Sequence, residues 1–158
     1  MLRAGDLFSA GRQGGVVGAL LRGRNGCIGV TAYHIMRLAG TRELLIGDAR
    51  AKVVSDWRAF DLVYFKVSGC EPTPLGSPRL GPARLASAIG ARDCSISDVG
   101  DLISVVIGHA NLPGPGESGT PLLQDEKVVG ILSSINLNSG KGTIISARVI
   151  EKGAEGLI

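Results

Sequence analysis

The chain has 158 residues, a length that fits one large domain or two very small ones. Hydrophobic residues make up 44% of it and charged residues 20%, which excludes a disordered chain. The net charge of +3 comes without a run of Lys or Arg and with only 4% aromatic residues, so nucleic-acid binding is not the expected function. The 24 glycines and seven prolines predict many tight turns between short strands, which is typical of an all-β fold.

The first half of the sequence predicts five strands in quick succession. They cover residues 15–21, 27–32, 43–46, 50–55 and 61–67. Asn25-Gly26, between the first two, is a strong hairpin signal. The fifth strand is rich in β-branched and aromatic residues, which favour strands.

The segment 71–83 holds four prolines and two glycines, so no regular element is expected to run through it. It predicts a linker between an N-terminal unit, residues 1–70, and a C-terminal unit, residues 84–158. In the second unit we expect strands at 102–107, 121–123, 128–134 and 142–147, and a short helix in the last ten residues. Two all-β halves suggest two small barrels, because closure removes exposed strand edges. The pattern alone leaves a single eight-stranded barrel or sandwich open.

Cysteine usage and the N-terminus bear on the compartment. Three cysteines, Cys27, Cys70 and Cys94, are an odd number, which argues against the disulfide framework of secreted proteins. The first residues lack the apolar region of a signal peptide, and the longest apolar stretch, residues 16–21, is too short to span a bilayer. We expect a cytoplasmic protein, or part of a larger intracellular polypeptide, without membrane contact.

Three segments have the residue types of nucleophilic catalysis. In Gly116-Glu117-Ser118-Gly119-Thr120-Pro121, glycines permit a sharp turn that exposes the serine hydroxyl, and backbone N–H groups there can face a developing negative charge. His34 follows an apolar strand that can hold it as a base. Asp61 opens an apolar strand, and a buried carboxylate needs a partner such as a histidine N–H. Each segment also fits a bland interpretation: a Gly/Pro turn, a structural histidine and an exposed turn aspartate.

Together, and in this chain order, the three segments resemble the trypsin-like serine proteases, especially their compact viral and intracellular bacterial members. The resemblance implies an all-β fold of two small antiparallel β-barrels of the chymotrypsin type, with the active site between them. It implies that Ser118 is the nucleophile, His34 the general base and Asp61 the residue that orients the histidine. The N–H groups of Gly116 and Ser118 would form the oxyanion hole.

The resemblance also assigns substrate contacts. Ser133, Ser134 and Ile135, on the strand beside the substrate, would offer backbone groups and pocket walls. Counting six residues back from Ser118 places Leu112 at the floor of the primary pocket, which then favours an apolar residue before the cut. The expected partner is a polypeptide substrate, with a fused or partner regulatory domain left open. No cofactor or metal is expected.

The sequence departs from the secreted members of this family in ways that concern activation. Their activation site is absent, and Arg12-Gln13-Gly14-Gly15-Val16 is only a faint echo of it. Their aspartate before the serine, which pairs with a new N-terminus, is Glu117 here, so Glu117 either has another partner or faces solvent. We therefore expect competence without cleavage. Two alternatives stay open: a protease that cuts once in cis, and a silent pseudo-protease that acts as a binding module.

Overall fold

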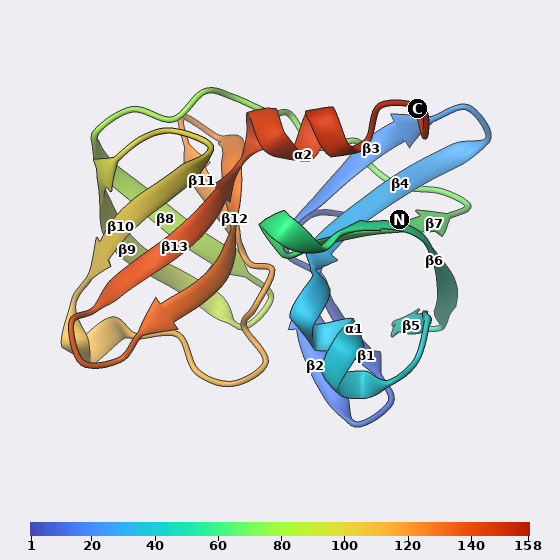
Figure 1. The fold of residues 1–158 in the computed structure, drawn as a ribbon, viewed down its shortest axis with the longest axis horizontal. Helices are drawn as coiled ribbons and strands as arrows, with labels where there is room; N and C mark the ends of the chain where they lie inside the picture. Colours follow the sequence, from blue (N-terminus) through green and yellow to red (C-terminus); the bar gives the residue numbers. More distant parts are fainter.

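The computed structural model describes residues 1–158, which form two β structures side by side (Figure 1). The first is a seven-stranded antiparallel sheet in the order β2-β1-β5-β6-β7-β4-β3. Its strands are β1 (Leu7–Ala10), β2 (Gln13–Val16), β3 (Ala19–Gly23), β4 (Gly26–Ala32), β5 (Glu43–Ile46), β6 (Ala49–Trp57) and β7 (Leu62–Val67). Helix α1 (Tyr33–Ala39) follows β4, and a 3-10 turn, η1 (Arg58–Phe60), precedes β7.

The second structure is a closed six-stranded barrel in the order β10-β13-β12-β11-β8-β9. Its strands are β8 (Gly81–Ser87), β9 (Gly90–Asp98), β10 (Leu102–Ile107), β11 (Pro121–Gln124), β12 (Lys127–Asn136) and β13 (Lys141–Ser146). A 3-10 turn, η2 (His109–Asn111), follows β10, and helix α2 (Ala147–Gly153) follows β13. Neither helix has the length or the apolar character to cross a membrane.

Turn chemistry sets several of the strand pairings. The predicted hairpin joins β3 to β4 through Arg24 and Asn25, and Gly26, the first residue of β4, pairs with Gly23 and has a φ of 124°. Asp125 and Glu126 turn β11 into β12 with positive φ at both positions, a geometry typical of tight hairpins. In β10, alternate residues Ile103, Val105 and Ile107 point into the barrel.

The predicted elements differ from the observed ones in several places. The strand expected at residues 15–21 is two strands, β2 and β3, because the pairing is interrupted at Val17-Gly18. Residues 81–83, placed in the linker, belong to β8. Strands β1, β8 and β9 and helix α1 were not predicted. The hairpin β8–β9 is largely exposed and polar, so it lacks the apolar alternation by which strands are recognised.

The two β structures share an apolar seam. Leu21, Val30 and Tyr64 of the sheet pack with Ile131, Ile145 and Ile150 of the C-terminal part in one buried cluster. The Tyr64 hydroxyl donates a hydrogen bond of 2.8 Å to the Ile150 carbonyl in α2, which lies at the top between the two structures in Figure 1. Helix α2 therefore follows the barrel in sequence and packs against both the barrel and the sheet.

The structure has one disulfide, although the odd number of cysteines argued against the disulfide framework of secreted proteins. Cys27, near the start of β4, bonds to Cys70, which lies just beyond β7. The register explains the contact: β4 and β7 are antiparallel neighbours, and Cys27 lies opposite Val67. Cys94, in β9, is the unpaired third cysteine that makes the count odd, and its burial raises the pKa of its thiol to about 11.

Candidate active site

Ser118, His34 and Asp61 come from three different elements that meet at the seam. His34 is the second residue of α1, directly after the buried strand β4. Asp61 closes the turn η1 with a φ of 55°, immediately before the buried strand β7. Ser118 lies on the loop between η2 and β11 of the barrel. One half thus supplies the histidine and the carboxylate, and the other supplies the serine.

The three side chains form a hydrogen-bonded chain. His34 Nε2 lies 3.0 Å from Ser118 Oγ, and His34 Nδ1 lies 2.8 Å from Asp61 Oδ2. The His34 backbone N–H donates to Asp61 Oδ1 at 2.8 Å, which fixes the carboxylate against the start of α1. The His34 side chain remains 30% exposed, so a ligand can reach the imidazole from solvent.

Asp61 has one further partner, Ser133 in β12. The Ser133 hydroxyl donates to Asp61 Oδ2 at 2.7 Å. Burial alone would raise the pKa of the Asp61 carboxyl, but the hydrogen bonds from His34 and Ser133 outweigh burial and hold that pKa below its usual range. The carboxylate is therefore ionised at neutral pH and can stabilise a positive charge on the imidazole.

The serine loop is held by backbone contacts to both the sheet and the barrel. The Val16 N–H donates to the Ser118 carbonyl at 3.0 Å, and the Gly119 N–H donates to the Leu132 carbonyl at 2.8 Å. Gly119 has a φ of 92°, and a Cβ there would collide with the Thr31 hydroxyl and the Val16 carbonyl, so this position requires glycine.

Two N–H groups on this loop have no protein acceptor. Neither the Gly116 N–H nor the Ser118 N–H donates a hydrogen bond within the protein, although their neighbours on the loop do. Gly116 adopts a φ of 85° and is exposed. The N–H groups of both predicted oxyanion residues are therefore free of protein acceptors.

The predicted substrate-binding residues fall into two places. Ser133, Ser134 and Ile135 lie on β12 beyond Ile131, the last residue of β12 that pairs with β11, so this stretch has a free edge. Leu112 follows η2 and is half-buried. Leu112 and Ile135 both pack on the apolar core of the barrel.

Sequence reasoning missed two contributions to the site. It assigned the backbone of Ser133 to substrate contact but not the Ser133 hydroxyl to Asp61, which lies 72 residues away. It also left Glu117 without a partner. Glu117 is buried and forms an ion pair with Arg92 of β9, and no local pattern around Arg92 marks it for this role.

The sequence matches no protein-family model and no curated protein. Solved structures match closely in fold. A glutamic acid specific serine protease, whose structure has a histidine triad in substrate binding, superposes with a TM-score of 0.79 at 11% identity, over 98% of each chain. The serine endoprotease from Yersinia pestis gives a TM-score of 0.74 at 19% identity, over 99% of this chain and 64% of that one.

A viral structure matches as well. The NSP4 proteinase from Equine Arteritis Virus gives a TM-score of 0.65 at 22% identity, over 92% of this chain and 74% of that one. The matching structures are chymotrypsin-fold serine proteases of bacteria and viruses, and the identities are low enough that the likeness concerns the fold. The barrel, the half-barrel sheet and the seam between them give this chain the chymotrypsin fold.

Proposed function

We propose that this chain is a serine endopeptidase that hydrolyses peptide bonds through an acyl-enzyme on Ser118. The observation that carries the proposal is the chain of hydrogen bonds from Ser118 Oγ through His34 to Asp61, at 3.0 and 2.8 Å. These distances are within the reach that proton transfer between nucleophile and base requires.

In the first half of the reaction, Ser118 Oγ attacks the carbonyl carbon of the substrate and His34 Nε2 accepts its proton. The positive imidazole is stabilised by the Asp61 carboxylate, which also holds the ring in the orientation that presents Nε2 to the serine. His34 then gives the proton to the leaving amine, and the acyl group stays on Ser118. In the second half, water attacks the ester with His34 again as the base, which releases the acid and restores the serine.

The tetrahedral intermediates carry a negative oxygen, and the N–H groups of Gly116 and Ser118 are the donors proposed to bind it. Support comes from their lack of any acceptor within the protein. Donors fixed in this way stabilise the charge without reorganisation at the moment of reaction. Removing one such donor in comparable enzymes lowers kcat by about 10²–10³-fold.

The substrate is proposed to be an extended polypeptide that adds to the free edge of β12 at Ser133 and Ile135. Antiparallel addition to a sheet edge supplies main-chain hydrogen bonds that do not depend on sequence. Side-chain preference is then proposed to come from a primary pocket with Leu112 at its floor, an apolar residue that packs on the barrel core. An apolar residue before the cut is therefore expected.

The test is covalent labelling followed by turnover. A fluorophosphonate should modify the wild type at Ser118, identified by peptide mass mapping, and a peptide library should reveal internal cleavage. Ser118→Ala should lose both signals while it keeps the wild-type circular dichroism spectrum. Ser9→Ala, which alters an exposed serine in β1, is the matched control and should keep both. A wild type that neither labels nor cleaves would show a silent pseudo-protease, and labelling without added-substrate turnover would show a protease that acts once in cis.

For the compartment, the Cys27–Cys70 bond favours an oxidising environment over the cytoplasm expected from the sequence. Free-thiol counting on protein isolated under alkylating conditions distinguishes the two. One thiol per chain, from Cys94, indicates the oxidised form, whereas three indicate a reducing compartment.

A further inference from the structure

Glu117, the residue directly before the nucleophile, holds a charge inside the protein. It is 7% exposed, although it lies on a loop whose neighbouring residues 114–116 are exposed. Burying a carboxylate costs free energy unless it is paired and hydrogen-bonded. The groups that pair with Glu117 therefore stabilise the conformation of the loop.

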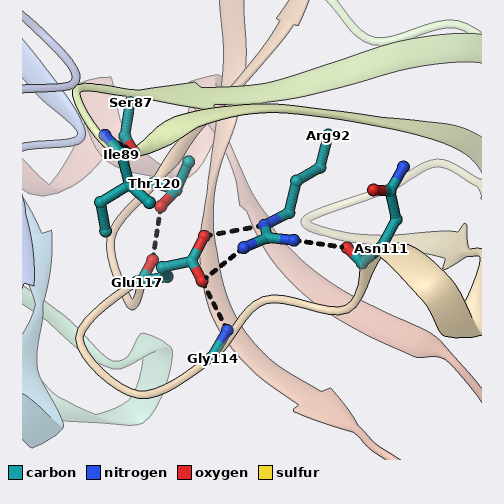
Figure 2. A network of polar contacts seen from close by, with 7 residues as sticks. All are labelled: Ser87, Ile89, Arg92, Asn111, Gly114, Glu117 and Thr120. Carbon is teal, nitrogen blue, oxygen red and sulfur yellow. Dashed lines mark hydrogen bonds and ion pairs between the residues drawn. The ribbon is translucent and has the colours of Figure 1, made fainter.

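Arg92, from β9 of the barrel, is the main partner (Figure 2). Its Nε and Nη2 donate to the two oxygens of Glu117 at 2.8 and 2.9 Å, a bidentate pair. Its Nη1 donates to the Asn111 carbonyl at 3.1 Å. The Gly114 N–H donates to Glu117 Oε2 at 2.5 Å. One guanidinium and one carboxylate thus hold the loop at residues 111, 114 and 117. We call Arg92, Asn111, Gly114 and Glu117 together the Arg92 clamp.

The clamp brackets the oxyanion residue. Gly116 lies between Gly114 and Glu117, the two loop positions joined through the Glu117 carboxylate. Beyond it, the Thr120 hydroxyl donates to the Glu117 carbonyl at 2.5 Å (Figure 2). The Thr120 N–H donates to the same carbonyl at 3.2 Å, which closes the turn of residues 117–120. A glycine with φ of 85° has many alternative conformations, so the loop needs this outside support to hold Gly116 as a donor.

The backbone of Arg92 is held by strand pairing. Arg92 lies opposite Leu85 of β8 in the closed barrel, and a planar guanidinium matches a carboxylate with two bonds in fixed directions. The segment 12–16, the echo of an activation site, lies largely in β2 and pairs with β1, so it offers no free amine to Glu117.

On the basis of the proposed function, we propose that Arg92 is a positioning residue that keeps the oxyanion loop permanently in its competent form. It supplies from barrel strand β9 the cation that Glu117 needs, and it acts on Gly116 through Glu117. Activity then requires neither a cleaved N-terminus nor a partner protein.

The experiment compares Arg92→Met with Arg84→Met, which removes an exposed arginine from the adjacent strand β8. Arg92→Met should lower kcat by up to about 10²–10³-fold, the effect of a lost oxyanion donor, with KM little changed. Arg84→Met should keep both parameters. Added guanidinium ion at millimolar concentration should restore part of kcat to Arg92→Met and leave Arg84→Met unaffected, a recovery that a merely destabilised fold would not show.

A second variant guards against misfolding. In Arg92→Met with Glu117→Gln, the unpaired charge is gone, so thermal stability should return toward wild type while kcat stays low. Wild-type kcat in folded Arg92→Met, or full recovery of kcat in the double variant, would overturn the positioning role. The wild-type enzyme separates this result from the proposed function: if the wild type itself neither labels nor turns over, the proposed function fails, whereas an active wild type with an equally active Arg92→Met refutes only the clamp.

Discussion

Breaking the Cys27–Cys70 bond should weaken the half of the molecule that holds His34 and Asp61. The bond closes a loop with a sequence separation of 43 residues. In the chain-entropy treatment, a loop of that length lowers the entropy of the unfolded chain by about 13 cal/mol/K, or about 4 kcal/mol at 25 °C. For a protein of this size, each kcal/mol corresponds to about 2–4 °C in Tm, so the expected loss is about 8–16 °C.

The measurement is differential scanning calorimetry of Cys27→Ala with Cys70→Ala, beside wild type with and without dithiothreitol. Cys94→Ala is the matched control, because Cys94 forms no disulfide, and its Tm should respond to reductant as the wild type does. Agreement between the reduced wild type and the double variant would assign the effect to the bond. A reduced wild type that melts within about 2 °C of the oxidised form would refute the reasoning, since it leaves no room for the loop-closure contribution.

Three other outcomes are expected. The lowered pKa of Asp61 adds stability above its unfolded pKa, about 3.9, that is lost as pH falls through the folded value. The stability gap between wild type and Asp61→Asn, from urea titrations, should therefore shrink below about pH 4; an unchanged gap refutes the linkage. Matched peptides should give a higher kcat/KM with Leu or Phe than with Arg or Lys before the cut, and the reverse order would show that the Leu112 pocket is misassigned. Deleting residues 1–13 should lower Tm without activating the enzyme, because it removes the buried Phe8 and Ala10; activation would reverse this view of the N-terminus.

The site residues were accessible from the sequence because each lies in a short segment with its own local chemistry. Gly116 and Gly119 mark the turn around Ser118, and apolar strands adjoin His34 and Asp61. The chain order of the three segments then predicted the fold, and the two β structures agree with it. In each segment, the residues that point to a functional side chain lie within a few positions of it in the sequence.

The contacts that the sequence did not reveal join distant residues. Arg92 is 25 positions from Glu117, and Ser133 is 72 positions from Asp61. An arginine on an exposed, polar strand looks like any other surface charge until the barrel closes and brings β9 to the serine loop. The disulfide was missed for the same reason. A count of cysteines does not say which strands are neighbours, whereas the antiparallel pairing of β4 with β7 brings Cys27 near Cys70.

The packing of α2 has a consequence for biosynthesis. A ribosome delivers the chain from the N-terminus, and β-rich units tend to fold in that order. Here the face of the sheet that carries Tyr64 and Val30 is completed only by Val149 and Ile150, which emerge after all the residues of the site. The nascent chain therefore holds His34, Asp61 and Ser118 before it holds the helix that fixes the two halves together. The array that aligns these three groups is thus expected to form only after α2 has been synthesised, so a partly made chain would not carry the proposed activity.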